Sequence, residues 1–400
     1  MRYARMYVAG TGRWLPPTVR VEDAVRDGRC RSSDVWRTGI ESVCVSEDAS
    51  GPEMAARAAR EALARAGVDH ADLVLHASTY HQGHDMWAPA SYVQRAALGE
   101  GGSPGSGAAG DIPHRSVPGG SVLPARGSGP RGHAGSGTGP ERVGRTADGS
   151  GGRGTAEHGP AFEVRQLSNG GLAALELAAG YLSAGGGRST ALLTTGDRFC
   201  PPGFDRWVTD PGTIYGDGGT ALVLSNRRGF ARLISLVTAS DPGLEGMQRG
   251  RRPFGAAPLE HGTPVDVDAA RRGFVADHGL DAVLERIDAG QEAALDRALS
   301  EADLKIEDVA RFVLPNLGLA RMRAHFLHRF EIDPERTTWE WGRRIGHLGA
   351  GDQFAGLHHL VASGGLLPGE RCVLVGVGAG FTWSVAVVEL LHRPEGGRGR

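Results

Sequence analysis

The sequence predicts an α/β fold built from two duplicated halves. Segments with helical character alternate along the chain with short apolar segments, which is typical of a mainly buried sheet covered by helices. One helix–turn–strand pattern, Ala-Leu-x-x-Ala-x-(Val/Leu)-x-x-x-Asp-(Leu/Val), occurs at residues 62–73 and again at 298–309. Each copy is followed further along the chain by a Gly-containing turn, a helix and an apolar strand, so the repeat extends through both halves.

The repeat of the first half begins with a helix that carries start and stop signals. Ser50-Gly-Pro-Glu53 has the spacing of a capping box with proline in the first turn, and Gly67 is typical of a helix end. After this helix we expect strands at 74–77, 162–167 and 191–195 and a helix at about 170–184.

The second half follows the same order. We expect strands at 311–315 and 372–377, a helix at about 353–364, and a Gly-rich turn at 345–352 before that helix. We therefore place an N-terminal half at residues 1–226, a C-terminal half at 227–393 and a flexible tail at 394–400.

The segment 99–159 differs from the rest of the chain. It holds 20 of the 63 glycines, many serines and prolines, and no sustained hydrophobic period. Such a segment buries too little apolar surface to offset the entropy lost on ordering it. We interpret it as a disordered insertion in a surface loop, which a fold tolerates because loop closure cost grows slowly with length. Docking of a carrier or partner protein is the alternative.

Composition excludes several classes of protein. The chain has 400 residues, 40% of them hydrophobic, and a net charge of −2, which argues against nucleic-acid and membrane-surface partners. The four cysteines are scattered without a C-x-x-C, so neither a disulfide framework nor a zinc site is indicated. No apolar run approaches 18 residues and no signal peptide is evident, so we expect a cytoplasmic protein.

Ser168 stands where the expected strand at 162–167 meets the following helix. A hydroxyl at such an elbow projects from the sheet edge beside the first free N–H groups of the helix. This position suits a nucleophile whose reaction generates an anion. Serine at this place also commonly caps the helix, so the segment by itself leaves both roles open.

Gly346-His347-Leu-Gly-Ala-Gly-Asp352 is the corresponding elbow of the second half. A nucleophilic serine needs a base, and a histidine base works best when a carboxylate holds its tautomer and stabilises the imidazolium. The glycines allow the bend that would bring His347 and Asp352 together. A hydrogen-bonded loop histidine is the alternative, but the duplication places His347 opposite Ser168 and favours the catalytic role.

Two further segments are candidates for the same site. The glycines of 376–384 would let backbone approach a ligand and offer N–H groups to an oxyanion, although a tight hairpin turn explains them equally well. Asn316, at the end of the strand at 311–315, is a candidate side-chain donor, or else a turn-closing residue.

Together these segments resemble the ketoacyl-acyl-carrier-protein synthase III branch of the thiolase superfamily. The matching pieces, which leave out the insertion, are 10–16, 37–40, 53–76, 162–170, 215–219 and 378–383. The resemblance implies a thiolase-like five-layered αβαβα sandwich of two similar halves, usually dimeric.

The departures from the family pattern concern the catalytic residues. The family has a cysteine at the position of Ser168, a histidine at Asn316 and an asparagine at His347, and Asp352 is an addition. This resembles a divergent branch of antibiotic biosynthesis that contains starter-unit synthases and acyltransferases. A serine hydroxyl needs a general base in contact more than a thiol does, which gives the added His–Asp pair a physical reason.

The resemblance also implies roles for residues away from this set. Trp36 and Arg37 match residues that receive the nucleotide end of coenzyme A, although an arginine on a helix surface is otherwise only a solvated charge. The backbone N–H groups of Ser168 and Ala379 match the oxyanion hole. Ala88 matches a position that lines the acyl pocket of the partner subunit.

These observations predict an acyltransferase of secondary metabolism. Ser168 would take an acyl group from a coenzyme A or carrier-protein thioester and pass it to a hydroxyl or amine of a small molecule. A priming ketosynthase that condenses the acyl group with malonyl-carrier protein is the first alternative. A non-catalytic partner in a polyketide synthase complex is the second. We expect a homodimer that needs no metal and no cofactor beyond its thioester substrate.

Overall fold

The computed structural model describes residues 1–99 and 158–394 of the chain. The predicted insertion at 99–159 and the predicted tail at 394–400 therefore lie almost entirely outside the described residues. The boundary between the two halves at residues 226 and 227 stays a prediction. None of the helices in the described ranges combines the length and apolar character needed to cross a membrane.

The described residues form a nine-stranded sheet in the order β5-β4-β6-β7-β1-β8-β11-β10-β9. Its strands are β1 (Tyr7–Trp14), β4 (Leu73–Ala77), β5 (Ala161–Val164), β6 (Thr190–Asp197), β7 (Gly218–Ser225), β8 (Ala231–Ser240), β9 (Arg311–Val313), β10 (Arg371–Gly378) and β11 (Thr382–Leu390).

The strand order reflects the duplication. The series β4-β6-β7-β1 of the first half is matched by β9-β10-β11-β8 of the second, and the last strands of the two series, β1 and β8, meet at the centre. β4 pairs in parallel with β6 as β9 does with β10, and the remaining pairs of both series are antiparallel. β1 and β8 pair through Tyr7–Arg232 and Val8–Ala231, and residues before β1 continue along β8 through a bridge between Arg2 and Ser235.

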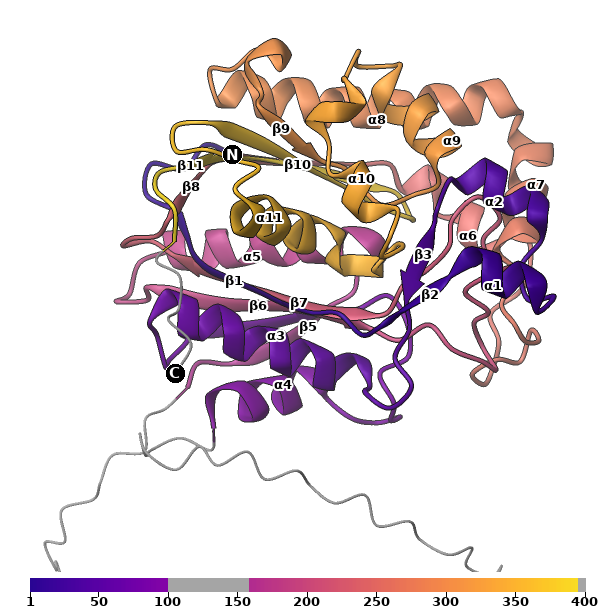
Figure 1. Cartoon of the computed structure of the whole chain (residues 1–400), viewed down its shortest axis with the longest axis horizontal. Coiled ribbons are helices and arrows are strands. Elements are labelled where there is room, and N and C mark those ends of the chain that lie inside the picture. Colours follow the sequence, from indigo (N-terminus) through magenta and orange to yellow (C-terminus); the bar gives the residue numbers. More distant parts are fainter. Residues whose placement is uncertain (100–157, 395–400) are drawn as a thin grey trace, which may run out of the picture. The chain divides into compact units, whose positions relative to one another are not determined.

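Helices separate and cover the two halves of the sheet, giving the five αβαβα layers that the family resemblance implies (Figure 1). The middle layer consists of α5 (Gly170–Ser183) and α11 (Asp352–Ser363), which contact strands of both halves. α3 (Gly51–Ala66) and α4 (Pro89–Leu98) cover the outer face of the first half, and α8 (Leu280–Glu301) covers that of the second.

Shorter elements complete the described part of the chain. Besides several single 3₁₀ and π turns, they are the strands β2 (Thr18–Arg20) and β3 (Ser42–Cys44), and the helices α1 (Val21–Arg26), α2 (Ser32–Thr38), α6 (Gly246–Arg249), α7 (Val267–His278), α9 (Leu319–Met322) and α10 (Trp339–Gly342).

The sequence of α3 explains why it lies so close to the sheet. Its buried face is rich in alanine, and the facing strand β1 contributes Gly10 and Gly12. A Cβ atom at Gly10 would lie 2.1 Å from the carbonyl oxygen of Ala62, and one at Gly12 would lie 2.1 Å from that of Ala58. Any larger residue at these two positions would push the helix outward.

Most of the predicted elements are confirmed within about two residues, and one strand is shorter than predicted. The strand expected at 162–167 ends at Val164, because Leu167 has a φ of 46° and begins a single 3₁₀ turn at 167–169. A left-handed leucine is unfavourable, and here it produces the sharp bend immediately before Ser168.

The buried carboxylate of Asp197, at the end of β6, ties two loops to the sheet. Its Oδ1 accepts hydrogen bonds from the amides of Thr79 (2.9 Å) and Tyr80 (2.8 Å), in the segment that follows β4. Its Oδ2 also lies against the second elbow, since a Cβ at Gly349 would be 2.6 Å away. Burial raises the pKa of Asp197 to about 7, although the amides of Tyr80 and Thr79 favour its charged form.

The capping box that begins α3 allows a first prediction. The Ser50 amide and hydroxyl both lie 2.7 Å from the Glu53 carboxylate, as predicted from the sequence. Ser50→Ala is expected to lower the free energy of unfolding by about 1 kcal/mol, the usual cost of losing a serine cap. Urea unfolding measures this cost. Ser50→Thr, which can still cap, is the control, and an equal loss in both variants would contradict the assignment.

The environment of Asp197 predicts a dependence of stability on pH. Its pKa is higher in the folded chain than in the unfolded one, so the stability linked to this group is complete below about pH 4 and is lost as the pH rises through 7. The amide side chain of the Asp197→Asn variant could still accept from both backbone amides but would not titrate. Between pH 5 and 8 the wild type is therefore expected to lose up to about 3 kcal/mol relative to Asp197→Asn. Urea unfolding of both proteins at the two pH values checks this, and parallel pH profiles would contradict it.

Candidate active site

The two elbows of the duplicated halves meet in the middle layer. Ser168 lies in the 3₁₀ turn at 167–169 that leads into α5, and the 3₁₀ turn at 349–351 leads into α11 in the same way. The two turns contact each other. Close approach depends on Gly171, where a Cβ would lie 2.6 Å from the Ala350 carbonyl oxygen.

Ser168, His347 and Asp352 form one continuous hydrogen-bonded chain. The Ser168 Oγ lies 2.8 Å from His347 Nε2, and His347 Nδ1 lies 2.6 Å from Asp352 Oδ2. Because an ionised carboxylate only accepts, Nδ1 carries the proton and Nε2 is free to accept from the serine hydroxyl. His347 and Asp352 are each 1% exposed, whereas Ser168 is half-buried. This is the nucleophile, base and orienter arrangement that the sequence predicts.

The backbone of His347 is held from the side by the segment 214–216. The His347 amide donates to the Ile214 carbonyl oxygen (3.0 Å), and the Gly216 amide donates to the carbonyl oxygen of His347 (2.9 Å). The Tyr215 ring packs on the imidazole with its centroid 5.0 Å away. The imidazole is thus fixed by its main chain and its ring face, not only by Asp352.

An ion-pair cluster around the buried Asp210 holds this tyrosine in turn. The Tyr215 hydroxyl donates to Asp210 Oδ2 (3.1 Å). Burial tends to raise the pKa of Asp210, but Arg321 and Arg271 together lower it to about 2. Burial also raises the pKa of Tyr215 far above its usual range, so this hydroxyl remains a donor.

Asp352 is surrounded by donors, and two of them come from Asn316. The backbone N–H of Asn316 donates to Asp352 Oδ2 (2.7 Å). The side-chain Nδ2 of Asn316 lies 3.3 Å from Asp352 Oδ1 and 3.1 Å from the carbonyl oxygen of Gly346. The Leu348 amide donates to Oδ1 (2.8 Å). The structure thus brings Asn316 into the site behind the carboxylate, where it positions Asp352 rather than facing Ser168.

The predicted hairpin around Ala379 lies against the first elbow. β10 and β11 form the hairpin, and Ala379 begins the turn between them. A Cβ at Gly378 would lie 2.4 Å from the carbonyl oxygen of Gln166 and 2.8 Å from the Cβ of Asn169. The hairpin interpretation is therefore correct, and the assignment of the Ala379 N–H to an oxyanion hole stays a prediction.

The structure does not place the other three candidates beside Ser168. Trp36 and Arg37 lie on α2 with exposed side chains, Trp36 being 89% exposed. Trp36 borders a surface groove together with Arg343 and Arg344, which directly precede the His347 elbow. Ala88 is exposed at the beginning of α4.

Sequence reasoning missed the contributions of Asn169 and Tyr215. Tyr215 belongs to a segment that matches the family pattern, but its packing on His347 cannot be read from that pattern. Asn169 follows the nucleophile directly, is fully buried, and donates to hydroxyls of β11. The only feature of the sequence that could have pointed to Asn169 is its position directly after Ser168.

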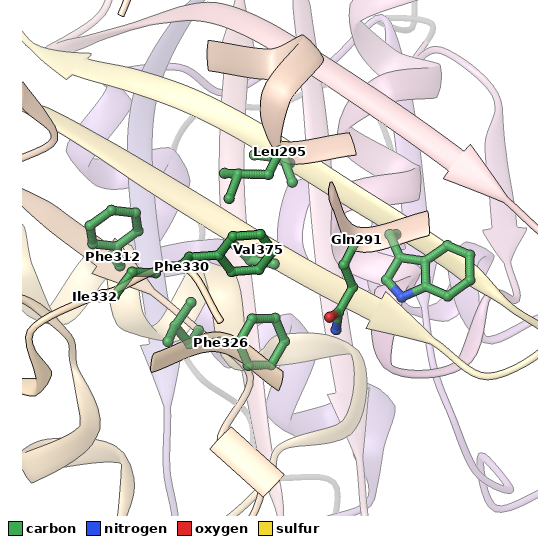
Figure 2. Close-up of a pocket in the computed structure, with 10 residues that line it drawn as sticks. Gln291, Leu295, Phe312, Phe326, Phe330, Ile332 and Val375 are labelled. Atoms are coloured by element: carbon green, nitrogen blue, oxygen red, sulfur yellow. The ribbon is translucent and has the colours of Figure 1, made fainter. Parts of the chain in front are cut away.

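Two other features do not contribute to this site. Among residues 1–99 and 158–394, no cluster of three or more His, Cys, Asp or Glu side chains could hold a metal ion. A small apolar cavity lies on the outer face of the second half, under α8 (Figure 2). Gln291, Leu295, Phe312 and Trp383 are among its lining residues, and none of the Ser168, His347 and Asp352 side chains reaches it.

Comparison with known proteins identifies the family. The family model described as the C-terminal part of 3-oxoacyl-[acyl-carrier-protein] synthase III matches residues 299–390. A search of curated proteins finds no match. Among solved structures, ChlB3, described as an acyltransferase, is 30% identical with a TM-score of 0.79, and the alignment covers 98% of this chain and 99% of that one.

Two more distant structures share the fold. The 3-oxoacyl-(acyl carrier protein) synthase III of Pseudomonas aeruginosa PAO1 is 20% identical with a TM-score of 0.66, covering 97% of this chain and 99% of that one. An OleA variant of Xanthomonas campestris with bound cerulenin is 17% identical with a TM-score of 0.63, covering 97% and 98%. The chain is thus an acyl-transferring enzyme that belongs to the 3-oxoacyl-[acyl-carrier-protein] synthase III-like family of the thiolase superfamily.

Proposed function

We propose that this protein is an acyltransferase of secondary metabolism that carries its acyl group on Ser168 and delivers it to a hydroxyl or amine of a small molecule. The observation that carries the proposal is the buried chain from Ser168 Oγ through His347 to Asp352, with distances of 2.8 Å and 2.6 Å. A serine without a base in contact would be a poor nucleophile, and here the base and its orienter are both in place.

The first half-reaction transfers the acyl group to the enzyme. Ser168 Oγ attacks the thioester carbonyl carbon while His347 Nε2 takes the hydroxyl proton. The tetrahedral intermediate then collapses, the carbon–sulfur bond breaks, and His347 returns the proton to the leaving thiolate. Asp352 stabilises the imidazolium between these steps. We assign the developing oxyanion to the backbone N–H groups of Ser168 and Ala379, which belong to two segments in contact.

The second half-reaction reverses these roles. An acceptor hydroxyl or amine attacks the acyl-serine carbonyl, and His347 takes the proton from the acceptor. The ester bond to Ser168 then breaks, and the serine regains its proton from His347. The products are the acylated acceptor and free enzyme.

The position of Asn316 favours this reaction over decarboxylative condensation. In the related ketosynthases the residues at the positions of Asn316 and His347 polarise a malonyl thioester. Here Asn316 Nδ2 is engaged by Asp352 and the Gly346 carbonyl oxygen, and His347 is engaged by Ser168. The description of ChlB3 as an acyltransferase supports the same choice.

We propose coenzyme A or a carrier protein as the acyl donor. The groove bordered by Trp36, Arg343 and Arg344 offers an exposed aromatic ring near the His347 elbow, which suits an adenine ring. Both guanidinium groups are paired with Glu41, a partner that a phosphate would replace. We further propose a homodimer in which Ala88 faces the acyl pocket of the partner.

Acylation of Ser168 is the direct test of the proposed function. Incubation with a panel of acyl-CoA and acyl-carrier thioesters is expected to add one acyl mass to the wild type and none to Ser168→Ala, as followed by intact-protein mass spectrometry. Asp352→Asn is expected to slow acylation by roughly 10³–10⁴-fold, because His347 would adopt the wrong tautomer.

The matched control is Ser183→Ala, which removes a hydroxyl from the far end of α5, the helix that follows Ser168. The Ser183→Ala variant is expected to gain the acyl adduct on Ser168 at the wild-type rate. The absence of an adduct in the wild type, or an unchanged rate in Ser168→Ala, would refute the acyl-serine mechanism.

A second prediction concerns the nucleotide end of the donor. Trp36→Ala and Arg37→Ala are each expected to raise KM for acyl-CoA by about tenfold with kcat unchanged, a loss of about 1.4 kcal/mol of binding. KM for the corresponding acyl-pantetheine, which lacks the nucleotide, is expected to stay the same. Arg26→Ala on the neighbouring helix α1 is the control, and equal effects on both donors would contradict the assignment.

A further inference from the structure

A chain of hydrogen-bonded polar side chains begins at the residue next to the nucleophile, buried at Asn169 and Ser384 and half-buried at Thr238 and Glu176. Asn169 is fully buried, and its Nδ2 donates to Ser384 Oγ (2.8 Å) and to Thr382 Oγ1 (3.1 Å). Both hydroxyls belong to β11, more than 200 residues further along the sequence. The side chain of Asn169 therefore links the elbow of Ser168 to the hairpin that carries Ala379.

The chain continues from Ser384 to a carboxylate on α5. Ser384 Oγ lies 2.7 Å from Thr238 Oγ1, and the Thr238 hydroxyl donates to Glu176 Oε2 (2.6 Å). An amide nitrogen only donates and a carboxylate only accepts, so every hydrogen bond in the chain has one direction. It runs from Asn169 to Ser384, then to Thr238, and ends on Glu176.

This fixed direction makes the link stiffer than separate hydrogen bonds would be. The single hydroxyl proton of Thr238 goes to the carboxylate, so that of Ser384 must go to Thr238, and the lone pairs of Ser384 are left for Asn169. Hydrogen bonds in such a series strengthen one another at low dielectric, and the one to the charged group is the strongest.

Glycines of β10 hold the Asn169 side chain on the other side. A Cβ at Gly376 would lie 2.3 Å from Asn169 Oδ1, and one at Gly378 would lie 2.8 Å from the Asn169 Cβ. The asparagine thus fits between the elbow and the hairpin with its nitrogen toward β11 and its oxygen toward β10. Ala379 follows Gly378 directly, so the position of its N–H depends on this contact.

We propose that Asn169, aligned by Ser384, Thr238 and Glu176, is the positioning residue that sets the separation between the N–H groups of Ser168 and Ala379. The inference rests on the proposed function, in which these two N–H groups hold the oxyanion. Asn169 lies next to the first donor in sequence and is hydrogen-bonded to the strand that follows the second. Loss of the chain would let the hairpin shift relative to the elbow without removing any group that contacts the substrate.

Single-turnover acylation tests this role. Ser384→Ala and Thr238→Val interrupt the chain and are expected to lower the maximal acylation rate by roughly 10–100-fold at an unchanged donor Kd, because misplaced oxyanion donors weaken only the transition state. Glu176→Leu is expected to have the same effect, whereas Glu176→Gln, whose side-chain oxygen can still accept from Thr238, is expected to restore most of the rate.

Ser235→Ala is the matched control. Ser235 lies on the same strand as Thr238 and is fully buried, and its hydroxyl donates to the Ala298 carbonyl oxygen (2.7 Å), outside the chain. Its loss is expected to lower thermal stability about as much as Ser384→Ala does, with no change in acylation rate. Equal rate losses in the two variants would show a general effect of destabilisation and would overturn the proposal.

Hydrogen exchange separates this inference from the proposed function. Amides of residues 378–382 are expected to exchange faster in Ser384→Ala and Glu176→Leu than in the wild type or in Ser235→Ala. This readout does not require catalysis. Unchanged exchange in both chain variants would overturn the proposal even if Ser168 is acylated, whereas a wild type that forms no adduct would refute the proposed function alone.

Discussion

The contact between the two elbows in the middle layer is the constraint on which the rest of the structure depends. In each half a 3₁₀ turn leads into a central helix. The two turns come into contact because glycines stand where the two backbones approach each other. This contact brings the hydroxyl of one half within 2.8 Å of the imidazole of the other. Neither half has a nucleophile and a base by itself, so the site exists only when both are folded together.

Burying a carboxylate at this junction has a cost that the surrounding donors offset. Asp352 is 1% exposed and accepts from His347 Nδ1, from Asn316 and from the Leu348 amide. A buried charge without such partners would be strongly destabilising. The same donors prevent the carboxylate from turning away from His347, so stability of the fold and orientation of the base come from one set of contacts.

The sequence predicted more of the fold than of the site. The repeat at 62–73 and 298–309, the cap at Ser50 and the helix stop at Gly67 are local patterns, and the structure confirms them. The strand predicted at 162–167 is too long, because Leu167 has a left-handed backbone conformation that a leucine does not signal and a glycine at this position would have. For Asn316 the sequence left open a side-chain donor to the site or a turn-closing residue, and only the structure shows its side chain held by Asp352 and Gly346.

The sequence by itself determined which residues could supply a nucleophile, a base and an orienter, because Ser168, His347 and Asp352 each lie in or beside a turn whose local pattern is recognisable. Only the tertiary structure decided how these residues are held. Asn316 meets Asp352 across 36 residues, and Asn169 meets Ser384 across 215. Such partners carry no local signal, because a hydrogen bond across the middle layer depends on which strands the fold brings together and not on the spacing between residues.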